Sequence, residues 1–201
     1  NGYLEECLID FSGYTPGETS GDIVQRIMPG QDLNGVYTKY LDMIAEYAHA
    51  LGDTPVLFRP FHENTGSWFW WGAAYCDSEA YKNLYSYTVD YLRDEKGVHN
   101  FIYVYSPSSE AETQADYEKR YPGDDYVDMI GFDMYHDNPR ATDSFINNLK
   151  NQIQLVDSFA KDHNKLFAVT ETGIRNGSED ALLLTGNTRK DWYNEILEAV
   201  A

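Results

Sequence analysis

Four short apolar segments alternate with segments of helical periodicity along this chain. The apolar segments cover residues 55–63, 100–106, 129–132 and 166–170. Apolar residues recur at helical spacing over 33–51, 78–95, 143–162 and 188–201, with a shorter helix expected within 112–121 and Ser78 as an N-cap. Largely apolar strands joined by helices form parallel sheets that helices cover. The pattern therefore predicts an α/β fold.

The strand ends favour a barrel over an open sheet. Polar residues stand at the carboxyl end of each apolar segment in turn, namely Glu63, Ser106, Asp133 with Tyr135, and Glu171. In a (β/α)8 TIM barrel these ends all face one pocket. No glycine-rich phosphate loop follows any of the strands, so a dinucleotide-binding open sheet loses its main support.

The length of the chain argues against a complete barrel. Four strands do not close a barrel, and such barrels typically need about 250 residues, whereas the chain has 201. No repeat, linker or low-complexity segment divides it. We therefore expect residues 1–201 to be a single domain with a partial barrel, as part of a larger domain.

Charge and composition restrict the classes of molecule that the chain can bind. The chain carries 33 acidic and 15 basic residues, a net charge of −18, which repels nucleic acid and anionic membranes. No apolar run approaches the ~20 residues that span a bilayer. Aromatic residues make up 15% of the chain, and Tyr and Trp suit amphipathic ligands such as sugars, although most of the 17 tyrosines are expected in packing roles. A neutral substrate fits best.

Two glutamates stand out because each ends a predicted strand. Glu63 follows the strand at 55–63, and Glu171 follows the strand at 166–170. Two carboxylates facing one pocket can hydrolyse a glycosidic bond, because one protonates the departing oxygen while the other attacks carbon. With 33 acidic residues in the chain, a chance pair remains an alternative at this point.

Further polar residues lie beside the two glutamates. Arg59 is a permanent cation that can keep a carboxylate ionised and oriented. His62 is adjacent to Glu63, and neighbouring strand residues point to opposite faces, so it reaches the pocket only if the strand end twists. Asp133 and Tyr135 are two apart on one strand face, where Tyr135 could donate to a nucleophile or simply pack at a barrel rim.

An aromatic loop follows Glu63 directly. Residues 64–77 contain Trp68, Trp70 and Trp71 between glycines. Three tryptophans beside a catalytic candidate favour a platform for sugar rings, and core packing is the alternative reading.

These stretches resemble glycoside hydrolase family 26, whose best-known members are endo-β-1,4-mannanases. The resemblance lies in RPFHENTGSWFWWG, GFDMYH and TETG and covers essentially the whole chain. It implies a retaining TIM-barrel glycosidase whose strands four to seven are the four found here, so residues 1–201 would be a single glycoside hydrolase catalytic domain that is incomplete at both ends. It also implies Glu63 as acid/base, Glu171 as nucleophile, and Arg59, His62, Trp68, Trp71, Asp133 and Tyr135 as substrate-binding or supporting residues.

The resemblance leaves alternatives open. Mixed-linkage β-1,3-1,4-glucan or β-1,3-xylan could replace mannan as substrate, and the barrel could bind carbohydrate without catalysis. A metal-dependent hydrolase using His62, Glu63, Asp133 and His136 is a further alternative, although His62 and Glu63 are neighbours expected to point apart. We expect no cofactor or metal, a β-mannan substrate, a monomer, and an extracellular or cell-surface location.

Overall fold

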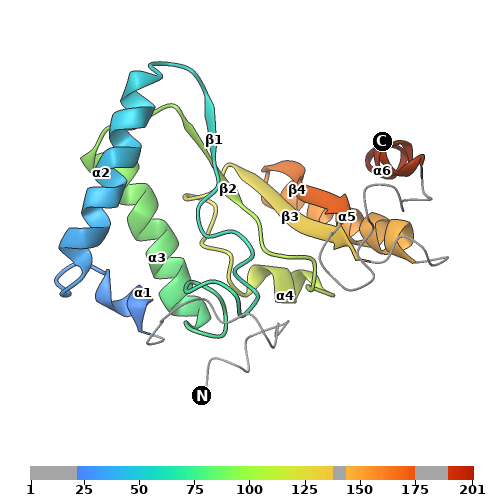
Figure 1. Cartoon of the computed structure of the whole chain (residues 1–201), viewed down its shortest axis with the longest axis horizontal. Helices are drawn as coiled ribbons and strands as arrows, with labels where there is room; N and C mark the ends of the chain where they lie inside the picture. The colour runs from blue at the N-terminus through green and yellow to red at the C-terminus, as the bar shows by residue number, and fades with distance from the viewer. Residues whose placement is uncertain (1–21, 138–143, 175–189) are drawn as a thin grey trace.

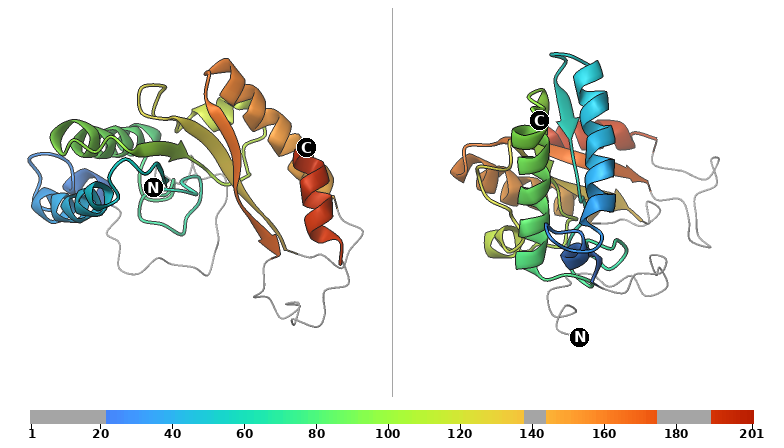
Figure 2. Two further views of the ribbon diagram at one scale, coloured as in Figure 1. Left: turned by 90° about the horizontal axis from the view of Figure 1, so that it is seen from above. Right: turned by 90° about the vertical axis from the view of Figure 1, so that its left-hand side faces the viewer.

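The computed structural model describes residues 22–137, 144–174 and 190–201. Their strands form one parallel sheet in the order β1-β2-β3-β4, made of Val56–Phe58, Phe101–Tyr105, Met129–His136 and Leu166–Ile174 (Figure 1). Strand order follows chain order, so each strand lies beside the next one along the sequence. The sheet is curled, with helices on its outer side (Figure 2). The expectation of an α/β fold with part of a barrel wall is confirmed.

A helix forms in each segment of predicted helical periodicity, and one further short helix, at 23–26, was not predicted. They are α1 (Ile23–Arg26), α2 (Asn34–Ala50), α3 (Ser78–Asp90) with a π-helical continuation η1 (Tyr91–Glu95), α4 (Gln114–Glu118), α5 (Phe145–Asp162) and α6 (Trp192–Val200). Ser78 was the wrong N-cap, because the extended Asp77 carries the carboxylate that accepts from the Ala80 amide at 2.8 Å. The predicted start of the last helix, at 188, lies outside the described residues.

The main core lies between the sheet and its outer helices. Buried side chains of α3, β3 and α5 meet there, including Leu84, Ile130, Phe132, Leu149 and Val156, each with at most 1% of its surface exposed. Burial of such aliphatic and aromatic side chains contributes roughly 1.5–3 kcal/mol each. The sheet therefore has an anchored outer face, and the other face carries the polar strand ends.

Helix α2 buries a different face from the one its spacing marked. The apolar residues that recur along it remain exposed, namely Val36, Tyr40, Met43, Tyr47 and Leu51. The smaller Leu41, Ala45 and Ala48 are buried instead, against Leu92 and Val98. The helix was predicted correctly, but its large apolar stripe has no covering partner among the described residues.

The strand predicted at 55–63 is shorter than expected. Pairing with β2 ends at Phe58, and the backbone then leaves the sheet. Phe61 and Glu63 have φ of 56° and 49°, the left-handed region that non-glycine residues rarely adopt. His62 and Glu63 therefore do not follow the alternation of a strand.

The last strand is longer than expected and contains a bulge. Pairing steps from Phe132–Val169 to Asp133–Glu171, so Thr170 is an extra residue on β4. A bulge breaks the two-residue alternation of side chains. As a result, Thr170 and Glu171 can both point towards β3 residues of the site.

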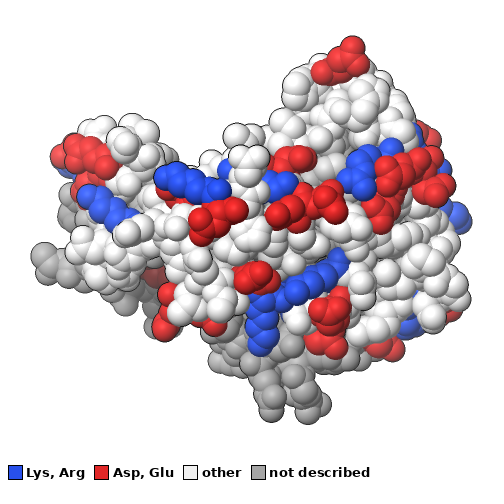
Figure 3. Space-filling view, turned by 180° about the vertical axis from the view of Figure 1, so that it is seen from behind, with Lys and Arg blue, Asp and Glu red and all other residues white. Residues whose placement is uncertain are grey.

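Acidic and basic side chains are mixed on the surface seen in Figure 3, without a continuous basic patch on that face. Within residues 22–137, 144–174 and 190–201, no helix is both long and apolar enough to cross a bilayer.

Candidate active site

The predicted site residues gather at the carboxyl ends of the strands. Arg59 lies at the centre, with its guanidinium between two carboxylates from β3 and β4. It donates to both oxygens of Asp133, at 3.2 and 2.9 Å, and forms an ion pair with Glu171. It also donates to the Ser106 hydroxyl at 3.0 Å, so all four strands are connected through one side chain.

Glu171 lies in a cationic environment suited to a nucleophile. Burial raises its pKa, but hydrogen bonds from Tyr135 and Arg59 and the charge of Arg59 outweigh this effect, so the pKa lies below its usual value. The Tyr135 hydroxyl donates to Glu171 Oε2 at 2.6 Å. The hydrogen bond to Glu171 raises the pKa of Tyr135 to about 12. At neutral pH Glu171 is therefore ionised and Tyr135 is a donor.

Asp133 is the most buried carboxylate of the site, with 2% of its surface exposed. Burial raises its pKa to about 7, although the Thr170 hydrogen bond and Arg59 oppose the shift. Thr170 donates to Asp133 Oδ1 at 2.6 Å, which the β4 bulge makes possible. Asp133 therefore supports Arg59 from the side away from Glu171.

Glu63 reaches the same place from the segment after β1. Its amide donates to the Ser106 carbonyl at 2.9 Å, and its side chain accepts from the Trp68 indole at 2.7 Å. One carboxylate oxygen each from Glu63, Asp133 and Glu171 lie within 4.8 Å of one another. Retaining glycosidases place their two carboxyl groups about 5–5.5 Å apart, and inverting enzymes place them about 6.5–9.5 Å apart. The spacing of Glu63 and Glu171 favours retention.

His62 reaches the pocket because the chain has left the strand conformation. Its Nε2 lies 4.0 Å from Glu171 Oε1, and its ring packs on Phe69 with a centroid distance of 4.9 Å. Burial and the charge of Arg59 lower its pKa, against the opposite effect of Glu171. His62 is therefore neutral near pH 7 and can exchange a hydrogen bond with a substrate hydroxyl.

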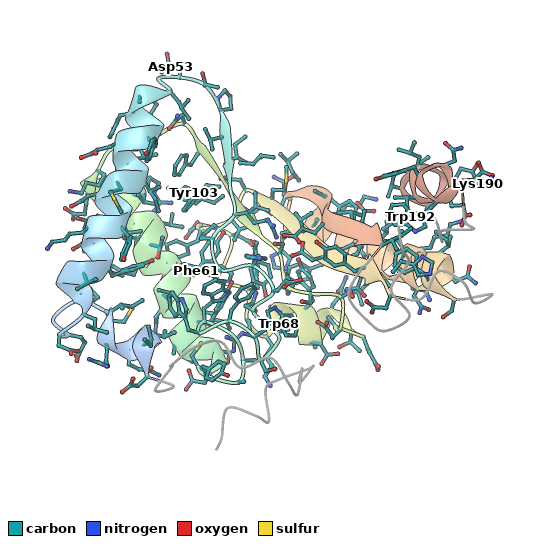
Figure 4. The ribbon with its side chains drawn as sticks, viewed as in Figure 1. Asp53, Phe61, Trp68, Tyr103, Lys190 and Trp192 are labelled. Atoms are coloured by element: carbon teal, nitrogen blue, oxygen red, sulfur yellow. The ribbon has the colours of Figure 1, made fainter. Side chains whose placement is uncertain are left out.

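The three tryptophans have different surroundings. Trp68 lies against Glu63, whereas Trp70 packs edge-on against Phe61 at 6.1 Å. Trp71 stacks on Phe69 at 4.4 Å, and its indole donates to the His62 carbonyl at 2.8 Å. Figure 4 shows Phe61 and Trp68 in the segment that leaves β1. Trp70 thus has a packing role, and the Trp71 indole fixes the backbone at His62.

Of the four ligands in the metal-dependent alternative, His62, Glu63 and Asp133 lie in the site, but His136 does not. His136 points to the helical side, where it stacks on Phe145 at 4.2 Å and accepts from the Trp192 indole at 3.1 Å. The three clustered carboxylates remain, but Arg59 already supplies the cation that neutralises Asp133 and Glu171.

Comparison with known proteins places this arrangement in a family. The model of glycosyl hydrolase family 26 matches residues 11–197. The chain belongs to glycosyl hydrolase family 26. A family 26 domain accounts for the partial barrel, and relatives of known sequence and structure agree with the assignment.

The mannan endo-1,4-β-mannosidase of Bifidobacterium adolescentis is 38% identical over 187 residues, which are 89% of this chain and 19% of that protein. The Bacillus subtilis protein of the same name is 35% identical over 83% of this chain and 44% of its own length. The catalytic domain of a Bacillus sp. family 26 endo-β-1,4-mannanase superposes with a TM-score of 0.81 at 41% identity, covering 96% of this chain and 50% of its own. The chain thus spans half or less of these relatives.

All eight site residues predicted from the family 26 resemblance lie within the described part of the chain, and six of them meet directly. Arg59, His62, Glu63, Asp133, Tyr135 and Glu171 form one cluster, with Trp68 bonded to Glu63 and Trp71 one layer behind. Their roles in binding and catalysis stay predictions.

Two contributors were missed by sequence reasoning. Thr170 directly precedes Glu171, and alternation would have put it on the opposite face, so only the bulge reveals it. Arg120 lies just after α4 and carries no motif, yet it is 2% exposed and bonded to the aromatic loop.

Proposed function

We propose that the protein is a retaining glycoside hydrolase that cleaves internal β-1,4-mannosidic bonds of mannan or galactomannan. Membership of glycosyl hydrolase family 26 and the names of its relatives support this substrate class. The observation that carries the proposal is the pairing of Glu63 and Glu171, whose oxygens approach within 4.8 Å beside Arg59.

The reaction proceeds by double displacement. Glu63 protonates the glycosidic oxygen while ionised Glu171 attacks the anomeric carbon, which breaks the glycosidic bond and forms a glycosyl ester. Glu63, now a carboxylate, removes a proton from water, and that water releases the sugar from Glu171. Tyr135 and Arg59 orient the Glu171 oxygens during attack, because they already bond to both of them.

Several finer points belong to the same proposal. Mixed-linkage glucan and β-1,3-xylan are the competing substrates. Polymeric mannan is too large to enter a cell unaided, which supports an extracellular or cell-surface location. We also propose a monomer, for which sedimentation velocity is the test. A non-catalytic carbohydrate-binding barrel has no need of two paired glutamates.

The test is hydrolysis by the full-length protein of galactomannan, lichenan and xylan. We expect galactomannan to be the preferred substrate, with viscosity falling faster than reducing ends accumulate, and the first-formed product to keep the β configuration by NMR. Glu63→Gln and Glu171→Gln should each lower kcat by about 10²-fold or more. Glu118→Gln, on the exposed side of α4, is the matched control and should retain activity.

Near-parental activity in either glutamate variant would remove the assignment of that residue. An inverted first product would contradict double displacement. Preference for lichenan or xylan would keep the mechanism and replace the substrate.

A further inference from the structure

Arg120 is a buried arginine outside the carboxylate cluster. Only 2% of its surface is exposed, and its guanidinium lies 4.7 Å from the centroid of the Tyr81 ring. Burial of a guanidinium is costly unless its donors are satisfied. Its partners therefore indicate what it holds in place.

Those partners are spread along the aromatic loop. Arg120 donates to the Asn64 side-chain oxygen at 3.0 Å, to the Trp71 carbonyl at 3.2 Å and to the Cys76 carbonyl at 3.0 Å. It also contacts the Cys76 sulfur at 3.4 Å. A single planar group thus joins the beginning, middle and end of residues 64–76. Hydrogen bonds to a charged group are stronger than those between neutral groups, so the loop conformation depends strongly on this residue.

The loop passes this constraint on to Glu63. Asn64 is the next residue in the chain, and the Trp71 indole fixes the His62 carbonyl at 2.8 Å. Trp68 folds back over Gly66, where an added Cβ would lie 2.2 Å from the indole ring, and donates to Glu63 at 2.7 Å. The side chain of Glu63 and the backbone on either side of it are therefore held from the loop side, while the Glu63 amide itself bonds to the Ser106 carbonyl at the end of β2.

A second contact of the same cluster supports the strained backbone. Tyr81, which lies under the Arg120 guanidinium, donates to the Phe61 carbonyl at 3.0 Å. Phe61 and Glu63 both have positive φ, a conformation that persists only when its surroundings impose it. By contrast, the contacts that hold Glu171 come from Arg59 and Tyr135, and none of the bonds described for Arg120 reaches them.

We propose that Arg120 is a positioning residue for the acid/base carboxylate: by fixing residues 64–76 it aims Glu63 at the glycosidic oxygen, without acting on the nucleophile Glu171. This inference rests on the proposed function. It distinguishes the two halves of the site, because Arg120 should matter for proton transfer and not for nucleophilic attack.

Substrates with different leaving groups separate these two steps. In a 2,4-dinitrophenyl β-mannobioside the dinitrophenolate leaves without being protonated. The kcat/KM for this substrate therefore reports nucleophilic attack alone. Mannan and mannopentaose need a proton from Glu63. A loss of overall structure would lower kcat/KM for both kinds of substrate in the same proportion.

The experiment uses the full-length protein with Arg120→Met and Arg120→Lys. Arg93→Met is the matched control, because Arg93 also lies near a tyrosine ring, at 5.9 Å from Tyr126, but is far more exposed and bonds to Asp90, Asp94 and the Asp125 carbonyl. We expect Arg120→Met to lower kcat/KM for mannopentaose about 10²-fold, the cost of misplacing a reacting group by about 1 Å. For the dinitrophenyl substrate the loss should stay under about threefold, and azide should restore its turnover. For Arg120→Lys, kcat/KM for mannopentaose should lie between the values of the parent and of Arg120→Met.

Equal losses on both substrates would overturn the proposal, as would full activity of Arg120→Met on mannopentaose. If Arg120→Met does not fold, Arg120→Lys decides by the same ratio. Labelling of Glu171 by a 2-fluoro mannosyl fluoride, followed by mass spectrometry, should proceed in the variants as in the parent. If the parent itself cleaves no mannoside, the proposed function fails, which is a different result from any of these.

Discussion

Tyr135 and Arg59 give the Glu171 carboxylate two donors, one on each oxygen. The same arginine also donates to the Asp133 carboxylate. These contacts give Glu171 and Asp133 different pKa values, although their carboxylate oxygens and one of Glu63 lie within 4.8 Å of one another. Glu171 has a lowered pKa and Asp133 has a pKa raised to about 7, so they differ in charge over a wide pH interval. Neighbouring like charges favour such a division.

Tyr135→Phe tests the donor on Glu171. Removing the hydrogen bond removes one cause of the lowered pKa, so the pKa of Glu171 should rise. Because Glu171 must be ionised to attack, the acid limb of the kcat/KM profile should move to higher pH. We also expect kcat/KM at neutral pH to fall about 10-fold or more, from loss of a charge-assisted bond. Tyr193→Phe, at a tyrosine 77% exposed, is the control; an unmoved acid limb in Tyr135→Phe would contradict this role.

Asp133 makes the stability of the fold depend on pH. Its folded-state pKa, about 7, lies above the ordinary aspartate value of 3.8, so between these values the folded state holds a proton that the unfolded state releases. Stability from this group is therefore full below pH 3.8 and is lost as pH rises towards 7. Asp133→Asn lacks this pH-dependent contribution. Its Tm at pH 8, relative to its Tm at pH 5, should therefore be higher than in the parent. Differential scanning calorimetry of parent and variant measures it, and parallel curves would refute the prediction.

At the level of elements, periodicity was sufficient for the helices and strands but not for their ends. Helices α3 and α5 bury the faces that their spacing marked, because both pack on the sheet. Helix α2 does not, since its large apolar residues face away from the described core. The two glutamates were found because polar residues at strand ends are conspicuous. The left-handed conformation of Phe61 and Glu63 and the bulge at Thr170 were not, because none of these three positions is a glycine; Pro60, directly before Phe61, is the one turn signal there.

Gly131 shows how closely β3 and β4 approach beside the site. A Cβ at this position would lie 2.6 Å from Thr170 Cγ2 and 2.7 Å from the Ala168 carbonyl oxygen. Because a backbone atom cannot move aside, Gly131→Ala should destabilise the protein by about 1–3 kcal/mol. It should also lower kcat/KM, since Thr170 would shift away from Asp133.

The matched control is Gly35→Ala in α2, where an added Cβ meets nothing within 4 Å. Replacing a helical glycine there should raise stability by roughly 0.5–1 kcal/mol. Urea unfolding of both variants gives the comparison. Equal stabilities of the two variants would show that the β3–β4 approach is less constrained than its geometry indicates.

For the molecule as a whole, the apolar stripe of α2 and the apolar residues of α6 lie at opposite ends of the described structure (Figure 1). Tyr47, Leu57, Leu166, Tyr193 and Leu197 are 58–77% exposed. Among the strands of the described residues, β1 and β4 are the outer ones, and each pairs with one described neighbour. Large exposed apolar surfaces and open strand edges promote association.

A polypeptide of residues 1–201 alone should therefore bind the dye ANS and self-associate. Tyr40→Lys with Tyr47→Lys, which places two charges on the α2 stripe, should reduce both effects in light scattering and fluorescence. Glu46→Gln, an exposed change of charge on the same helix, is the control and should leave association in place. A monomeric parent polypeptide without ANS fluorescence would contradict the expectation.

The separate anchoring of Glu63 and Glu171, the two carboxylates of the proposed mechanism, has a consequence for how such a protein can change. Glu171 depends on neighbouring strands of the sheet, whereas Glu63 depends on a loop fastened to the end of a short helix through Arg120. Sequence drift or laboratory selection within 65–75 can thus reshape the side of the cleft that receives the departing sugar, while the bond-forming side keeps its geometry. In this fold, the preference for a leaving group can therefore change while the geometry of nucleophilic attack is retained.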